Sequence, residues 1–319
     1  MTIRTIGVVA VLLAAGLVQS ATRLEFQGVR ANYTGEGQLL LGELVGDYMY
    51  TLLITGNTST MAKTGGLTIT PREKNTKNRV FINTIYSTVP LTTIKITMPP
   101  GREIACYVRN IYVMGSLGKL DITGGDLGSS DMYEGQVVVQ GTLGDVRVRG
   151  KNFKIAGSNE WWGGNIWADI YGDGPTKRIE TYGGHMYYHP LAQMLGNVDI
   201  NGKLDKLYLR AYEDKKAGTV VGAGLRGSIV VNNDVLKQLD IRGGAMIGSS
   251  FDCLQLQKIK LTGQKPGSPQ PAFRQGISQT YVTAADVGGD GSDSDLKNMT
   301  IKDGMLHNSL FGIKGHINA

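Results

Sequence analysis

Three aspartates near the C-terminus have the residue type and spacing to bind a cation. Asp290, Asp293 and Asp295 lie on a backbone of glycine and serine, so their carboxylates can turn toward one point. Ca²⁺ takes six to eight oxygen ligands, although this spacing differs from that of an EF-hand loop. The sequence therefore predicts a candidate Ca²⁺ site here, with a solvated polar loop as the alternative.

All three tryptophans lie close together in the sequence, at Trp161, Trp162 and Trp167. Aromatic side chains stack on sugar rings and anchor protein interfaces. Glycines flank the Trp161–Trp162 pair, as they would in a surface insert. The segment predicts a binding or assembly surface, and packing in a local core is the alternative.

Carboxylates and histidines in the middle of the chain are the candidates for catalysis or metal binding. They are Asp169, Asp173, Glu180, Asp199, His185 and His189. The carboxylates could converge on one face if adjacent turns of chain stack, but solvated acidic residues are the favoured interpretation. An adjacent Asp-Asp pair, which would supply acid and base carboxylates, does not occur in the chain. The two histidines have no evident third metal ligand. The sequence thus predicts no catalytic residue and no cofactor beyond the candidate Ca²⁺.

The elements that would carry these residues are indicated by a short repeated phrase, Leu-x-x-apolar-x-apolar-x, often closed by glycine. Its copies begin at Leu91, Leu117, Leu143, Leu195, Leu204, Leu236, Leu256 and Leu296. A phrase that recurs with inserts of variable length is typical of stacked repeats. The first three copies begin 26 residues apart, which suits one turn of two or three short strands.

Each copy predicts a short β-strand with one buried face. Its last two apolar residues are two positions apart and share a face, with a polar residue between them in most copies. The leading leucine is out of that period and suits an inward corner, and the copies at Leu195 and Leu204 suit two strands of one turn. No helical periodicity occurs. We expect an all-β fold, a right-handed parallel β-solenoid with irregular inserts, and a β-sandwich is the alternative.

This repeat resembles that of the parallel β-helix proteins, which include pectate-lyase-like enzymes, bacterial adhesins and phage tailspikes. The resemblance covers roughly residues 85–305 and concerns architecture, since no family signature accompanies the repeat. It implies either a stiff surface rod or a protein that binds or cleaves polysaccharide. Architecture does not decide between these functions.

The first twenty residues predict export. Residues 1–20 combine Arg4 with an apolar run and end in small residues before Ala21, the pattern of a secretory signal peptide. The uncharged run is shorter than the roughly 20 residues that span a bilayer, and no later stretch predicts a transmembrane segment. We therefore expect a protein that is secreted or held at the cell surface.

The mature chain is expected to have three parts. Residues 21–90 fit the repeat less well and predict an N-terminal β cap or small β-domain, followed by the solenoid of residues 91–305. Residues 306–319 predict a C-terminal tail or cap, in which Phe311 and Ile313 would lie on a strand that pairs with a neighbouring copy.

The charge and the cysteines limit the partners of the chain. Its formal net charge is +6, with lysine and arginine spread singly along the strands, which predicts a solvated outer face. A basic surface would favour an acidic polysaccharide. No nucleic-acid-binding motif is present, so a sequence-specific nucleic-acid partner is not expected. Cys106 and Cys253 would lie several turns apart along a stack and are expected to be buried rather than bridged.

Together these patterns predict a non-enzymatic structural protein, a subunit of an extracellular filament, sheath or surface layer whose main partner is another copy of itself. An adhesin role overlaps this prediction. The alternative is a polysaccharide-binding protein, or a polysaccharide lyase or hydrolase of the β-helix type.

Overall fold

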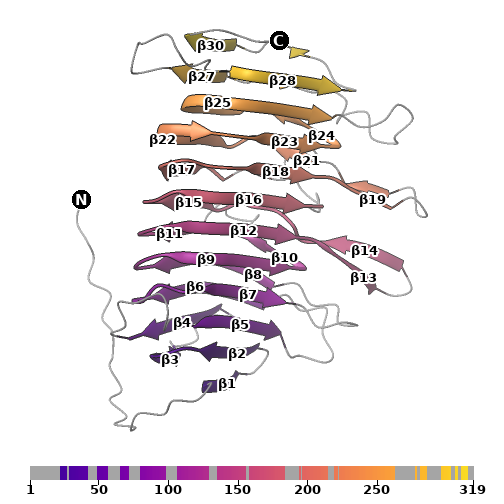
Figure 1. Cartoon of the computed structure of the whole chain (residues 1–319). Helices are drawn as coiled ribbons and strands as arrows, with labels where there is room; N and C mark the ends of the chain where they lie inside the picture. The colour runs from indigo at the N-terminus through magenta and orange to yellow at the C-terminus, as the bar shows by residue number, and fades with distance from the viewer. Residues whose placement is uncertain are drawn as a thin grey trace.

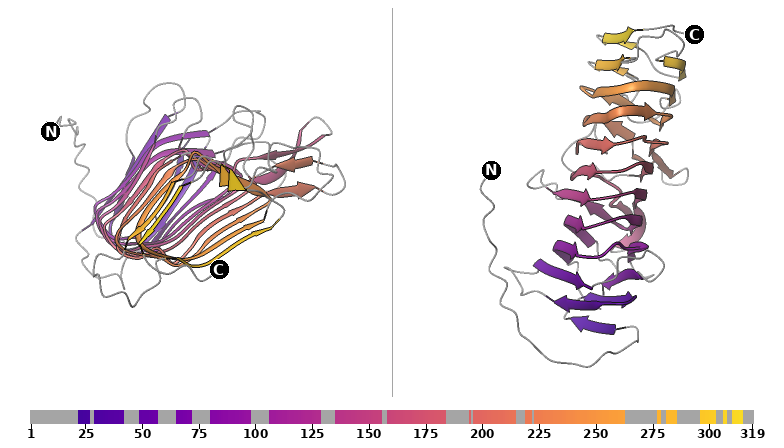
Figure 2. Two further views of the ribbon diagram at one scale, coloured as in Figure 1. Left: turned by 90° about the horizontal axis from the view of Figure 1, so that it is seen from above. Right: turned by 60° about the vertical axis from the view of Figure 1, so that its left-hand side comes forward.

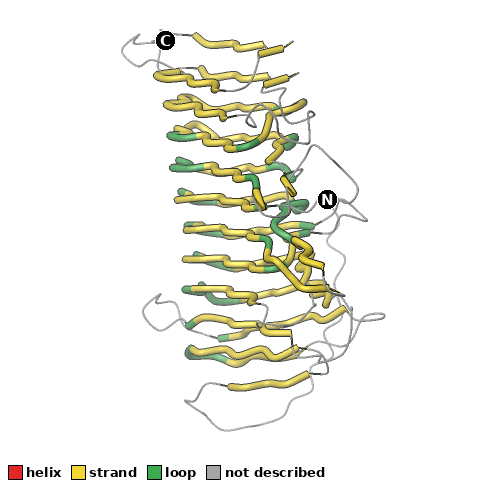
Figure 3. The backbone as a smooth tube through the Cα atoms, turned by 90° about the vertical axis from the view of Figure 1, so that its right-hand side faces the viewer, coloured by secondary structure: helices red, strands yellow, loops and turns green. Residues whose placement is uncertain are grey.

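The strands of the computed structural model stack in layers along one axis (Figure 1). The structure describes residues 22–26, 29–41, 49–56, 65–71, 80–97, 106–128, 135–155, 158–183, 194, 196–214, 219–221, 223–262, 277–278, 281–285, 296–302, 306–307 and 310–314. These residues form strands and connections without a helix (Figure 3), and they contain no helical segment that could cross a membrane. The protein is therefore all-β, as expected.

Most strands pair in parallel with a strand one turn later, and they form three ladders. Ladder one consists of β4 (Met49–Thr55), β6 (Val80–Ser87), β8 (Cys106–Val113), β11 (Gln136–Val139), β15 (Asp169–Gly172), β17 (Val198–Asn201), β22 (Ser228–Leu236), β25 (Ser250–Thr262), β27 (Tyr281–Ala285) and β30 (Leu310–Lys314). Ladder two consists of β5 (Gly66–Pro71), β7 (Thr93–Thr97), β9 (Leu117–Thr123), β12 (Leu143–Arg149), β16 (Thr176–Tyr182), β18 (Leu207–Arg210), β23 (Leu239–Arg242), the second half of β25, and β28 (Leu296–Lys302). Ladder three consists of the first halves of β6 and β8, β10 (Gly125–Leu127), single bridges at Ile166 and Met194, β21 (Ala223–Leu225), β24 (Gly244–Ile247), β26 (Ile277–Ser278) and β29 (Leu306–His307).

Each turn of the chain visits ladder three, ladder one and ladder two in that order. In one turn, residues 106–108 pair in ladder three, residues 110–113 in ladder one and Leu117–Thr123 in ladder two. Leu117 is in register with Leu91 before it and Leu143 after it, so the 26-residue interval is one turn of three strands. This parallel pairing differs from the antiparallel sheets of the β-sandwich alternative.

Columns of apolar side chains fill the interior, one residue per turn. The corner column of ladder two consists of Leu91, Leu117, Leu143, Thr176, Leu204, Leu236, Leu256 and Leu296. The inward strand positions form further columns, such as the fully buried Ile94, Leu120 and Val146. Burying one such aliphatic side chain contributes about 1.5–3 kcal/mol. A single strand buries only a few of them, so each turn depends on its neighbours for stability.

Two features of the repeat differ from a simple stack of equivalent copies. The copy at Leu195 supplies β17 of ladder one, whereas Leu204 begins the ladder-two portion of the same turn. The two copies are therefore two strands of one turn, as predicted. The ladder-two strand β16 does not match the repeated phrase because Thr176 occupies the corner position that leucine has in the other copies.

Antiparallel pairing is found at the N-terminal end of the stack. β1 (Thr22–Phe26) pairs with β2 (Val29–Thr34), β2 with β5, and β3 (Gln38–Leu41) with β4. β4 and β5 also pair in parallel with β6 and β7, so the parallel stack begins upstream of residue 91. At the other end, β29 and β30 extend ladders three and one into residues 306–319.

The corner between ladders two and three is closed in two ways. In compact turns it is a glycine with positive φ, 80° at Gly124 and 76° at Gly243, which other residues adopt at a cost. In two other turns an antiparallel hairpin leaves the stack: β13 (Lys151–Ile155) with β14 (Ser158–Trp162), and β19 (Tyr212–Asp214) with β20 (Thr219–Val221). Seen from above, both hairpins project to the same side (Figure 2).

Candidate functional site: the outer face of ladder two

The outward positions of ladder two form a broad charged surface, which we call the basic face. Parallel strands in register place equivalent residues about 4.8 Å apart, so the polar residues of successive phrases line up in columns. Its ionisable residues include Lys95, Lys119, Asp121, Asp145, Arg147, Arg149, Arg178, Glu180, Lys206, Tyr208, Arg210, Asp240, Arg242, Lys258, Lys260 and Lys302. Lysine and arginine outnumber aspartate and glutamate among them.

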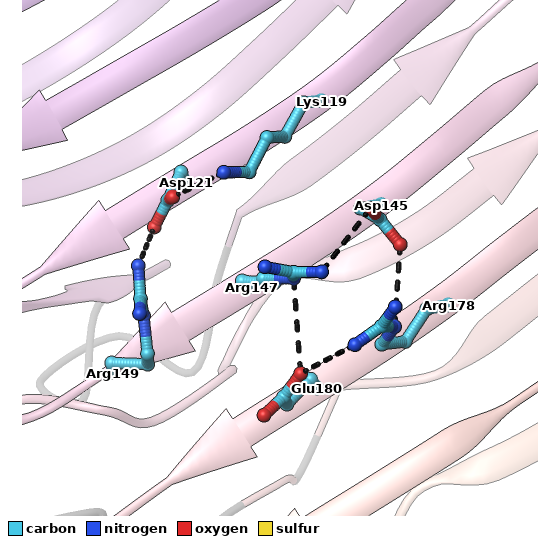
Figure 4. Close-up of polar contacts among 7 residues, drawn as sticks. All are labelled: Lys119, Asp121, Asp145, Arg147, Arg149, Arg178 and Glu180. Carbon is cyan, nitrogen blue, oxygen red and sulfur yellow. Dashed lines mark hydrogen bonds and ion pairs between the residues drawn. The ribbon is translucent and has the colours of Figure 1, made fainter.

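Asp121 is held by two cations, one from its own strand and one from the next turn (Figure 4). The Lys119 ammonium lies 2.7 Å from Oδ2 of Asp121, and the Arg149 guanidinium lies 2.6 Å from Oδ1. Burial by itself would raise the pKa of Asp121, but hydrogen bonds and charge attraction from Lys119 and Arg149 outweigh it and lower the pKa. The carboxylate therefore stays charged at neutral pH and is unsuited to act as a general acid.

Four side chains on the next two turns form an alternating ring of charge (Figure 4). The Arg147 and Arg178 guanidinium groups each lie 3.3 Å from the carboxylate of Asp145. The same two groups lie 3.8 and 3.4 Å from Oε2 of Glu180. Because Asp145 and Arg147 belong to β12 and Arg178 and Glu180 to β16, the ring joins two turns of the stack.

Tyr208 lies at an outward position but is only 2% exposed, because three cationic side chains cover its ring. The distances to the ring centroid are 4.5 Å from Lys206 Nζ, 4.0 Å from Arg210 Cζ and 5.1 Å from Arg242 Cζ. Burial raises the pKa of Tyr208, against the opposing charges of Arg210 and Arg242. Arg242 also donates to the buried Asp240 at 3.0 Å. The stacked ring thus holds cations at fixed places on the face.

The carboxylates proposed from sequence as one cluster lie on two faces. Asp169, Asp173 and Asp199 belong to ladder one or its flanking corner, and adjacent turns bring them near one another as expected. Glu180 lies on ladder two within the ring described above. Ladders one and two are separate strand stacks, so Glu180 does not join the other three. Within the described residues, no three His, Cys, Asp or Glu side chains are placed to hold a metal ion.

The tryptophans are divided between a hairpin and the stack. Trp161 and Trp162 belong to β14, where their backbones pair with Asn152 and Lys151 on the projecting hairpin. Trp167 lies in the stack at 5% exposure, and its Nε1 donates to Asp126 Oδ2 at 3.4 Å. Trp167 therefore packs locally, whereas Trp161 and Trp162 are carried by an element that leaves the stack.

The C-terminal candidates fall on the last described strand of ladder one. Phe311 and Ile313 are in register with Val282 and Ala284, at positions that point inward in earlier turns. Among the described residues, β30 pairs with β27 alone. Residues 1–20, His185, His189 and the candidate calcium ligands Asp290, Asp293 and Asp295 lie outside the described residues.

Neither cysteine forms a disulfide and both are buried, as predicted. Cys106 lies in ladder three and Cys253 in ladder one, several turns apart. Burial raises the pKa of the Cys106 thiol to about 12. A thiol with this pKa is a poor nucleophile at neutral pH.

The sequence analysis missed a polar ladder along the corner where ladder one begins. There a side-chain oxygen accepts from the backbone N–H of the equivalent residue one turn later. The bonds join Asn110 to Gln136 at 3.1 Å, Asp169 to Asn197 at 2.8 Å and Asn197 to Ser228 at 3.0 Å. These residues precede an apolar-x-apolar pair in ladder one, and aligning those pairs would have revealed them.

The basic face gathers charge along many turns rather than at one point. The protein matches no protein-family model, and neither the curated proteins nor the solved structures contain a significant match to it.

Proposed function

We propose that the chain is a right-handed parallel β-solenoid that serves as an exported, non-enzymatic structural subunit of an extracellular filament, sheath or surface layer. The observation that carries this proposal is the way polar groups are used. Along ladder two they form ion pairs between turns, such as Arg149 with Asp121, and along ladder one they bond the next turn's backbone. Side chains committed to their neighbours in this way stiffen a rod, whereas catalysis needs groups that converge on a substrate.

The ends of the stack supply a route to assembly. At the C-terminal end β30 has one described partner, and at the N-terminal end β1 and β3 each have one. A strand with one unpaired edge can accept a strand from another molecule by β-augmentation. Copies joined in this way would continue the ladders from one molecule into the next and so form filaments. This favours another copy of the chain as the source of the partner strand.

Deletion of residues 308–319 tests this route. We expect the mature chain, from Ala21 onward, to form filaments in negative-stain electron microscopy and the deletion variant to remain as single rods, with an unchanged β-type circular dichroism spectrum. Lys314→Ala, which keeps β30, is the matched control and should assemble normally. Filaments of undiminished length from the deletion variant would exclude assembly through this strand.

Export rests on the pattern of residues 1–20. We expect a chain expressed with these residues in its native host to be recovered outside the cytoplasm and to begin at Ala21. N-terminal sequencing of the recovered protein tests this expectation, because a chain that retains Met1 or Thr2 would lack a cleaved signal peptide.

Polysaccharide binding is the second candidate, and the hairpin with Trp161 and Trp162 favours it. The hairpin extends from the side of the stack at the end of β12, adjacent to the basic face (Figure 1). An acidic polysaccharide lying along that face could contact both. Glycan-array binding that is lost in Trp161→Ala with Trp162→Ala supports this candidate, and a lyase assay for the unsaturated product tests for cleavage.

A further inference from the structure

The outward positions of ladder one differ in charge from those of ladder two. We call this surface the acidic face; it comprises the outward residues of ladder one from Thr51 to Ala285. Its aspartates are Asp169, Asp173, Asp199 and Asp252. No lysine or arginine lies between these limits on the strand segments paired in ladder one, although Arg109 lies at the corner where ladder one begins and Lys314 ends β30, beyond Ala285. Uncharged residues such as Tyr86, Tyr112 and Asn232 fill the rest of it.

One strand shows the segregation directly. β25 contributes to both ladders, and it presents Asp252 from its ladder-one half and Lys258 and Lys260 from its ladder-two half. Asp252 and Lys258 are both exposed, and neither forms an ion pair with another described residue. Within β25, lysine therefore lies only in the ladder-two half.

The two faces also share one axial period. Every turn adds one strand to ladder one and one to ladder two, so charges recur on both faces at the same spacing of about 4.8 Å per strand. Any second copy has the identical period, and the two surfaces can therefore match turn for turn. A partner of unrelated structure would match this period only by chance.

We propose that the basic face of one copy docks side by side on the acidic face of a second copy. The inference rests on the proposed structural function and adds a lateral contact to it. Opposite charge steers the two faces together and sets their orientation. The contact uses different surfaces on the two copies, so it is heterologous and produces rings or open arrays, the arrangement of a sheath or surface layer.

The size of the surface suits this contact. The basic face runs from β7 to β28, which at about 4.8 Å per strand and ~16 Å of strand length gives a planar area of roughly 600 Å². Two such faces approach the lower limit of about 1,200 Å² for a specific interface. The contact joins oppositely charged surfaces, so we expect it to weaken as salt rises, with a Debye length of about 8 Å at 0.15 M.

A charge-swap experiment tests the docking. The first variant, Asp173→Lys with Asp252→Lys, makes the acidic face basic, and the second, Lys258→Glu with Lys302→Glu, makes the basic face acidic. All four residues are exposed. By sedimentation velocity at low salt, we expect each variant alone to associate at least roughly tenfold more weakly than the wild type, and an equimolar mixture to recover association. Arg226→Glu, an exposed site outside both faces, is the control and should behave as the wild type.

The outcomes separate this inference from the proposed function. Variants that assemble laterally as well as the wild type, or a mixture that does not recover, overturn the docking. Filaments joined only end to end overturn it while leaving the structural function intact. A chain that stays monomeric and binds a polyanion such as heparin through Lys258 and Lys302 contradicts both. Unchanged circular dichroism spectra and melting temperatures confirm that the variants are folded.

Discussion

Thr181 offers a direct test of the inward columns, because its hydroxyl lies where the stack has apolar side chains. Thr181 is fully buried, its Oγ1 has no hydrogen-bond partner, and its register neighbours are Val148 and Leu209. A buried hydroxyl without a partner costs about 1–3 kcal/mol. Valine has nearly the same shape and no hydroxyl. Thr181→Val should therefore raise the free energy of unfolding by about 1–3 kcal/mol.

The measurement is urea unfolding followed by circular dichroism, with Thr181→Ser as the matched control. Serine keeps the hydroxyl and removes the methyl group, so it should lower the free energy of unfolding by about 0.5–1.5 kcal/mol. A thermal scan should show a rise of roughly 2–6 °C for the valine variant. If Thr181→Val destabilised the protein as much as Thr181→Ser, the hydroxyl would have a partner and the assignment of this column to a dry interior would be refuted.

Three further outcomes follow from the structure and a fourth from the sequence. Leu143→Ala in the corner column, at 0% exposure, should cost about 2–5 kcal/mol in urea unfolding, and a cost below 1 kcal/mol would contradict a packed corner. The pKa of Asp121 is lower in the folded protein than its ordinary value of 3.8, so the charged carboxylate stabilises the fold above pH 3.8 and this stabilisation is lost as the pH falls through the folded-state pKa. The difference in the free energy of unfolding between the wild type and Asp121→Asn should therefore shrink between pH 5 and about pH 2. Cys106 should resist a thiol reagent at pH 8 until the chain is unfolded, and rapid labelling of the native protein would contradict its burial. If Asp290 and Asp293 bind Ca²⁺, chelation should lower the melting temperature of the wild type but not of Asp290→Ala with Asp293→Ala.

The sequence predicted the parts of the fold that depend on a local repeat. The corner leucines, the single buried strand face and the 26-residue turn follow from residues such as Leu91, Leu117 and Leu143, because parallel stacking in register repeats the same local environment. The strand at Thr176 was missed for the same reason, since a threonine in the corner breaks the phrase while the neighbouring turns still hold the strand in place.

The candidate site could not be predicted as fully from the sequence, because its contacts depend on the register between turns. Arg149 pairs with Asp121 only because their strands are adjacent and aligned, although the two residues are far apart in sequence. The assignment of alternate polar residues to two oppositely charged faces likewise requires knowing which strands belong to which ladder. Glu180 was grouped with Asp169 and Asp199 because sequence proximity cannot distinguish the two ladders.

Cryo-electron microscopy of the purified mature protein tests the structural function most directly. We expect rods whose strands lie across the long axis at a spacing of about 4.8 Å, joined to other copies in filaments or side-by-side arrays at low salt. Compact particles that remain single at every protein and salt concentration would contradict it.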